Sequence, residues 1–294
     1  MRKPMKHSLL FALSFVLLSA CSRETPAPDS GTLVLGVAVP PQAGLLRAMA
    51  PEGLPLDIVT LIDGAQNPHS FEPGAKQLAD LSRCSLYVSA GLPFETALVP
   101  RLQALNSSMR IVWVEPDAEH DHDHHDEHED HDDPHWWMST DGMQRQTDVL
   151  LEALAALDPD HVAEWTQGHK AFVTRLAKAD ADTKARFEPY RGRAFLAYHP
   201  AWGQFAAETG LRQFSIEQHG AAPTAKHLAE LSRAVQDEGI RAILVQSESE
   251  AERAKPFADS LGLAIVHLNP LEPDPFVRLQ KTIDAVLQSL APNP

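Results

Sequence analysis

The chain has 294 residues and a formal net charge of −15, with 40 acidic against 25 basic side chains. This length exceeds what one hydrophobic core comfortably supports and suggests two lobes. The excess of acidic residues, with no basic stripe to meet phosphate groups, argues against nucleic acid as a partner.

The N-terminus has the features of a secretory signal. Three basic residues, at positions 2, 3 and 6, precede the apolar stretch Ser8–Ala20, which is too short to span a membrane. Residues 1–20 are therefore predicted to be a signal peptide. Its Leu-Ser-Ala end, followed by Cys21, resembles a bacterial lipobox, which implies cleavage before Cys21 and lipidation of its sulfur. Residues 21–31 contain prolines and small polar side chains and are expected to tether the lipid to the domain. Cys84 is then the one unmodified cysteine, which excludes an intramolecular disulfide.

An alternation of apolar runs and amphipathic segments follows the tether. Leu33–Val39 (LVLGVAV) is a continuous apolar run, typical of a parallel strand buried on both faces. This alternation predicts an α/β lobe with a parallel sheet over residues 32–157. Its other strands are predicted at 56–61, 85–89 and 110–114, and its first helices at 42–50, 74–83 and 95–105.

A histidine-rich segment interrupts this lobe. Seven of the fifteen histidines lie in the segment from Glu119 to His135, and nearly all of the remaining residues of this segment are Asp or Glu. With almost no apolar side chain to bury, residues 119–135 are expected to form a solvated loop. Imidazole and carboxylate groups together are ligands for borderline divalent metals such as zinc; an acidic solubilising loop is the alternative. The predicted auxiliary metal ligands of the loop are His120, His122, His124, His125, His128 and His131.

Two helices are predicted after the loop, the first capped by Ser139 or Thr140. The second starts with Asp158 as N-cap and Pro159 at its first position, and its apolar residues recur every three or four positions towards Phe187. Residues 158–188 are therefore expected to form one long connecting helix.

A second α/β lobe is predicted at residues 189–294. Its strands are expected at 193–198, 213–217, 242–246 and 263–268, and its helices at 202–209, 224–238, 250–261 and 275–290. The predicted fold class is thus α/β, with two lobes that each contain a four-stranded, mostly parallel sheet with flanking helices, joined by one long backbone helix.

Three histidines stand where such a fold binds ligands, beyond the carboxyl ends of strands. His69 lies in an Asn-Pro-His motif after the second strand, His135 in Asp-Pro-His-Trp at the end of the loop, and His199 in Tyr-His-Pro after the strand at 193–198. Each is next to a proline, which stiffens the backbone and reduces the entropy lost when an ion binds. Trp136 and Trp137 are expected to wall the site, exclude water and support His135.

These motifs resemble a known family, the solute-binding proteins of bacterial ABC importers for zinc and manganese, also called the ZnuA/TroA-like group or cluster 9. The resemblance covers nearly everything after the tether. It implies a metal ion between two lobes, held by His69 and His135 from the first lobe and by His199 from the second. The chain is similar to the zinc branch, because manganese members tend to have a carboxylate at the position of His199. Nitrogen ligands also favour zinc over manganese.

One departure from the family concerns the fourth ligand. Many members have an Asp after the last strand, whereas this chain has Asn269 followed by Pro270. Asn269 is a neutral and poorer ligand, so the fourth position is left open between Asn269, water and another residue. The alternative role for Asn269 is that of a turn residue.

The resemblance implies a high-affinity extracytoplasmic receptor that delivers Zn²⁺ to an ABC permease and its ATPase subunit. The receptor is expected to be a monomeric lipoprotein, on the periplasmic side or the cell surface, and not an enzyme. Zinc is its transported ligand, and the histidine loop collects zinc weakly or senses its abundance. Two alternatives remain beside this function: a surface zinc buffer or adhesin without a transporter, and a zinc hydrolase with three histidines and an activated water. Against the hydrolase, the sequence has no His-Glu-x-x-His motif with an evident general base.

Overall fold

The structure is a computed structural model that describes residues 31–62, 71–113, 133–217 and 222–290. The predicted signal peptide, Cys21, His69 and the loop histidines from His120 to His131 lie outside the described residues. The described residues from Thr32 onwards form one compact unit, which contains two separate sheets.

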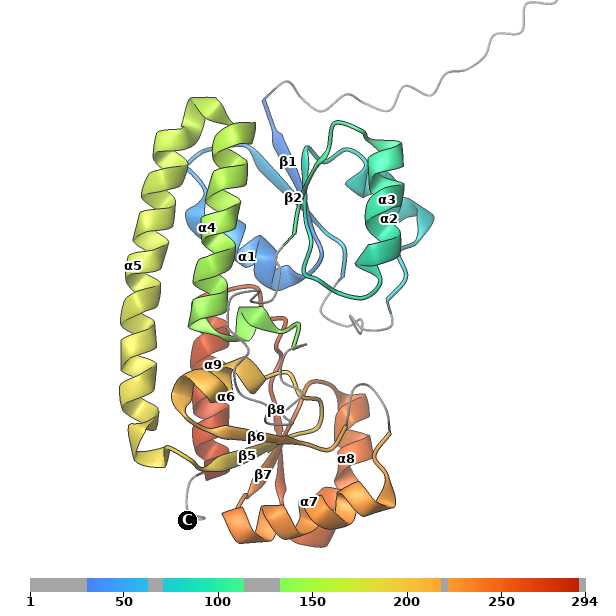
Figure 1. The fold of residues 1–294 in the computed structure, drawn as a ribbon, viewed down its shortest axis with the longest axis vertical. Helices are drawn as coiled ribbons and strands as arrows, with labels where there is room; N and C mark the ends of the chain where they lie inside the picture. The colour runs from blue at the N-terminus through green and yellow to red at the C-terminus, as the bar shows by residue number, and fades with distance from the viewer. Residues whose placement is uncertain (1–30, 63–70, 114–132, 218–221, 291–294) are drawn as a thin grey trace, which may run out of the picture. The chain divides into compact units, whose positions relative to one another are not determined.

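The first sheet has four parallel strands in the order β2-β1-β3-β4 (Figure 1). Its central strand β1 is the apolar run LVLGV, and four of its five residues are buried, as expected for a strand covered on both faces. The elements of this lobe are β1 Leu33–Val37, α1 Pro40–Met49, β2 Leu56–Thr60, α2 Ala75–Leu81, β3 Leu86–Val88, α3 Glu95–Leu105 and β4 Arg110–Val112.

The second sheet repeats this arrangement, with four parallel strands in the order β6-β5-β7-β8 (Figure 1). The predicted α/β class with two four-stranded sheets is therefore confirmed. The elements of this lobe are β5 Ala194–Ala197, α6 Gly203–Thr209, β6 Arg212–Ser215, α7 Ala225–Glu238, β7 Ala242–Val245, α8 Glu248–Leu261, β8 Ala264–His267 and α9 Pro275–Leu290.

Two long helices, α4 Thr140–Leu157 and α5 Val162–Phe187, connect the sheets and lie side by side (Figure 1). Ser139 caps α4 as predicted, because its hydroxyl accepts a hydrogen bond from the Gly142 N–H. The second helix starts as predicted, with Asp158 at the N-cap position and Pro159 at the first helical position. Its first turn, Pro159–His161, is 3₁₀ and leads directly into α5. The Asp158 carboxylate accepts bonds from the His161 ring and the Trp165 indole, and makes no side-chain bond to the helix backbone.

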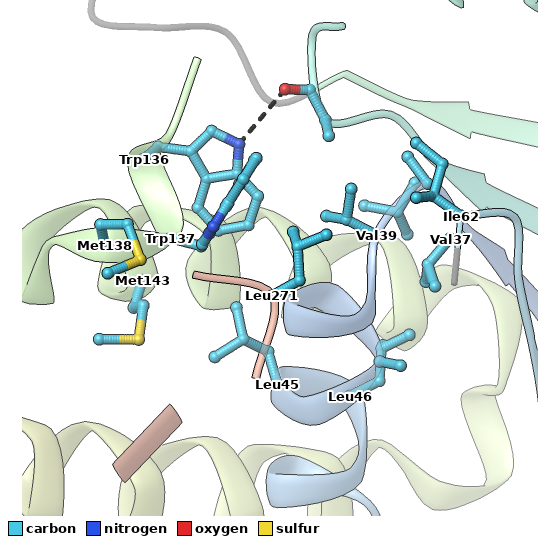
Figure 2. Packing of buried hydrophobic residues seen from close by; sticks show 14 of the residues in the cluster. Val37, Val39, Leu45, Leu46, Ile62, Trp136, Trp137, Met138, Met143 and Leu271 are labelled. Carbon is cyan, nitrogen blue, oxygen red and sulfur yellow. Dashed lines mark hydrogen bonds between the residues drawn. The ribbon is translucent and has the colours of Figure 1, made fainter. Parts of the chain in front are cut away.

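The main hydrophobic cluster joins the first sheet, α1, α4, α5 and α9. Figure 2 shows part of it, where Trp136, Trp137 and Met138 pack near Leu45 and Leu271. These three residues form a short 3₁₀ turn, Trp136–Met138, directly after His135. The histidine at the end of the loop is thus attached to the buried core. In the described parts of the chain, every helix falls short of the length or apolarity needed to cross a bilayer.

Candidate metal centre

The structure brings together two of the three predicted ligands, His135 and His199, which are 64 residues apart in the sequence. Their Nε2 atoms lie 3.4 Å apart, and their ring centroids are separated by 5.2 Å. Both side chains are largely buried, with exposed fractions of 7% for His135 and 12% for His199. Two imidazole nitrogens therefore face each other in a place with restricted access to water.

His199 is positioned by the end of strand β5. The N–H of Tyr198, just after that strand, donates to the Leu244 carbonyl, and the Ala201 N–H donates to the His199 carbonyl. The Trp202 N–H then donates to the Gln213 side-chain oxygen at 2.7 Å. These bonds fix the turn between β5 and α6 at the carboxyl end of the second sheet, where ligands of such sheets are expected.

His135 is positioned by the two tryptophans that follow it. The Trp136 indole donates to the Ala90 carbonyl at 3.4 Å, drawn as a dashed line in Figure 2, and the Trp137 indole donates to the Pro270 carbonyl at 3.0 Å. The Trp137 ring also lies edge-on to the His135 ring, with centroids 5.4 Å apart. Since both tryptophans are almost fully buried, they anchor the His135 turn to two loops of the fold.

A carboxylate orients each histidine through a contact with its Nδ1 atom. Asp133 Oδ1 lies 2.6 Å from His135 Nδ1, and Glu217 Oε2 lies 3.0 Å from His199 Nδ1. Carboxylates in this position hold the ring, leave Nε2 pointing to the metal and increase the basicity of the ligand. Sequence analysis did not identify Asp133 or Glu217 as functional residues.

The spacing of the two nitrogens fits a zinc ion. Zinc binds imidazole nitrogen at about 2.0–2.1 Å in tetrahedral geometry, so two such nitrogens are about 3.3–3.4 Å apart. The observed separation of 3.4 Å equals this value. The distance between the two nitrogens therefore matches that between two corners of a zinc tetrahedron.

The electrostatic surroundings favour a neutral His199 ring and an ionised Asp133 carboxylate, the states that suit a metal ligand and its supporting carboxylate. Burial and the neighbouring His135 lower the pKa of His199, against the opposing effect of Glu217. Burial acts to raise the pKa of Asp133, but its hydrogen bond and charge attraction to His135 hold that pKa below the usual value. At neutral pH the His199 ring is thus neutral and the Asp133 carboxylate is ionised.

The fourth candidate ligand, Asn269, is less well placed. Asn269 is exposed, and its Oδ1 accepts a hydrogen bond from the Leu271 N–H at 2.8 Å, as in the alternative role of a turn residue. Among the described residues, no group of three or more His, Cys, Asp or Glu side chains is arranged to hold one ion. His69 lies outside these residues, so its part in the site stays a prediction.

Two parallel α/β sheets joined by a long helix, with His135 and His199 side by side beyond the end of β5, are what a solute receptor of the metal-binding class is expected to have. The family profile of the zinc-uptake complex component A, periplasmic (ZnuA), matches residues 37–291. The chain belongs to this family, whose members are metal-binding transport receptors and not enzymes.

Known proteins agree with this assignment. The chain is 26% identical over 277 residues to the zinc-binding lipoprotein AdcA of Streptococcus pneumoniae, covering 90% of this chain and 54% of that protein. It is 26% identical over 238 residues to the zinc-binding protein AdcA of Streptococcus pyogenes, covering 74% and 46%. It thus spans about half the length of these relatives. A zinc-bound ZnuA deletion mutant has a similar structure, with a TM-score of 0.79 and 26% identity over 90% of this chain and 100% of that one.

Proposed function

We propose that this chain is an extracytoplasmic zinc receptor that captures Zn²⁺ and delivers it to an ABC permease with its ATPase subunit. The observation that carries the proposal is the 3.4 Å separation of the two Nε2 atoms, each backed by a carboxylate on the other ring nitrogen. Membership of the zinc-uptake family supports the same ligand.

The proposed first ligand shell consists of His69, His135 and His199, with the fourth position taken by water or another group. Neutral imidazoles of this kind favour zinc over manganese, because manganese prefers oxygen ligands. The Oδ1 atom of Asn269 already accepts a backbone hydrogen bond, which makes water the better candidate for the fourth position. Zinc is here the cargo of the receptor and not a resident cofactor.

The proposed location is outside the cytoplasm. Residues 1–20 act as the signal peptide, Cys21 carries the lipid, and residues 21–31 tether a monomeric receptor to the membrane. The name of the pneumococcal relative as a lipoprotein supports this proposal. The lobes at 32–157 and 189–294, with the connecting segment 158–188, are the proposed functional parts of the receptor.

The proposed role of the loop histidines is auxiliary. Clustered, solvated imidazoles and carboxylates bind zinc individually with low affinity but raise its local concentration. Replacing residues 119–132 with a Gly/Ser linker should therefore remove several weak sites and leave one tight site in a chelator-competition titration. Loss of the tight site in this variant would identify the loop as the primary binding site and refute the proposal.

The tight site is tested by His199→Ala in the same titration. Removing one of three imidazoles should weaken zinc binding at least 100-fold, because it leaves an incomplete ligand set. The matched control is His169→Ala, since His169 also pairs with a carboxylate, Asp148, but lies on α5 away from the site. Equal affinities for the two variants would contradict the assignment.

The transport role is tested by zinc uptake in cells that lack this chain. At limiting external zinc, uptake should fall strongly and return when the wild-type gene, but not the His199→Ala variant, is restored. Unchanged uptake would support the zinc buffer or adhesin alternative.

A further inference from the structure

The segment that carries His135 is bound directly to α6, the helix that follows His199. Gln204, in the first turn of α6, uses both ends of its amide. Its Nε2 donates to the Asp133 carbonyl at 3.1 Å, and its Oε1 accepts from the Ser139 hydroxyl at 3.0 Å. One side chain therefore bridges the two ends of the segment in which His135 lies.

Glu208, one turn further along α6, holds the next residues of the same segment. Its carboxylate accepts hydrogen bonds from the Thr140 N–H at 2.9 Å and from the Asp141 N–H at 2.8 Å. These are donors of the first turn of α4, which have no partner within their own helix. Residues four apart lie on one face of a helix, so Gln204 and Glu208 act from the same side of α6.

The start of α6 also lies against the carboxylate that orients His135. A Cβ atom on Gly203 would be 2.8 Å from Asp133 Oδ2, closer than atoms of this kind approach each other. The absence of a side chain at Gly203 thus permits Asp133 to lie where it reaches His135 Nδ1.

These contacts place His199 and the supports of His135 on one short stretch, residues 199–208. We infer that α6 sets the distance between the two histidines, with Gln204 and Glu208 as positioning residues that determine zinc affinity. This inference rests on the proposed zinc site. In this view, the hydrogen bonds of Gln204 and Glu208 fix the distance between His135 and His199. The chain connection through α4 and α5 contributes less to that distance.

The test is zinc titration of Gln204→Leu, which keeps an apolar body of similar size and removes both bonds. Loss of supports of this kind typically weakens metal binding 10- to 100-fold, and we expect a change in that range. The cobalt-substituted variant should also show an altered visible absorption spectrum, because the geometry of the two imidazoles around the metal changes.

Asn106→Leu is the matched control for a purely structural effect. The Asn106 amide bridges the Ser82 and Cys84 carbonyls in the first lobe, at 3.1 and 3.0 Å, so both variants lose an amide that ties down a loop. Asn106→Leu should lower the melting temperature without changing the zinc affinity or the cobalt spectrum. If Gln204→Leu also keeps wild-type affinity and spectrum, the inference is wrong.

A second variant, Gly203→Ala, tests the same inference without removing a hydrogen-bonding group. The added methyl group should displace Asp133 and weaken zinc binding, whereas affinity equal to that of the wild type would overturn the role of α6. Failure of the proposed function itself is distinguishable, because then the wild-type protein would lack a tight zinc site and His199→Ala would change nothing.

Discussion

At the scale of single residues, the site depends on pairs of side chains more than on the histidines alone. Each ring has one nitrogen at a carboxylate and the other directed to its neighbour. The rings are therefore held in position by the protein itself, which would lower the ordering cost of zinc binding at the proposed site. Burial adds to this effect, since it keeps His199 neutral.

The carboxylates should contribute measurably to affinity. Asp133→Asn and Glu217→Gln keep the shape of each side chain but remove its charge, so each should weaken zinc binding about 10- to 100-fold. Chelator-competition titration measures this change. Asp148→Asn is the control, because Asp148 pairs with His169 outside the site, and its zinc affinity should equal that of the wild type. Wild-type affinity in both site variants would show that the carboxylates do not support the ligands.

The lowered pKa of His199 should appear in the stability of the metal-free protein. A pKa below the unfolded value of about 6.5 means that the unfolded chain binds more protons than the folded one in this range. The contribution of His199 is therefore fully present above pH 6.5 and is lost as the pH falls towards the folded pKa. As the pH is lowered from 8 to 5, the melting temperature of the metal-free wild type should fall more steeply than that of His199→Gln. Parallel curves would contradict this origin of the pH dependence.

At the scale of helices and strands, much of the structure follows from local sequence patterns. Apolar runs located the strands, and the candidate cap Ser139 located the start of α4. Asp158 and Pro159 start the next helix as predicted, but the Asp158 carboxylate accepts from two side chains and not from the helix backbone. The sequence did not reveal these two side-chain hydrogen bonds, because they depend on how Trp165 packs in the folded chain.

The contact between α1 and α5 depends on a residue without a side chain. A Cβ atom on Gly168 would lie 2.1 Å from the Met49 carbonyl oxygen, so Gly168→Ala would force the two helices apart. We expect a loss of about 1–3 kcal/mol in the free energy of unfolding, as for other overpacked contacts, measured by urea denaturation. Thr174→Ala, on an exposed part of the same helix, should change stability by less than about 0.5 kcal/mol. A neutral or stabilising Gly168→Ala would show that α1 and α5 can separate freely.

At the scale of the whole molecule, the site combines segments that are far apart in sequence. The histidine motifs were recognisable because each is a local pattern of proline and histidine, but their carboxylate partners depend on the fold. In the register of β5 and β6, Ala197 pairs with Ser215, so the same offset of 18 places Glu217 opposite His199. That register could not be derived from periodicity, which explains why Glu217 was missed.

Zinc should stabilise the whole chain if it binds only the folded form. At a free zinc concentration of 100 times the dissociation constant, linkage predicts a gain of about 2.7 kcal/mol. Calorimetric melting of the wild type with and without zinc should show an upward shift, and His199→Ala should lose most of it. An equal shift in both proteins would place the stabilising ion elsewhere.

The central claim is that His135 and His199 share one zinc ion, and anomalous diffraction from zinc-loaded crystals tests it most directly. The structure predicts a single strong zinc peak about 2.0–2.1 Å from the Nε2 atoms of both histidines, with their separation close to the present 3.4 Å. A peak bound to only one of them, or absent from the space between them, would contradict the account.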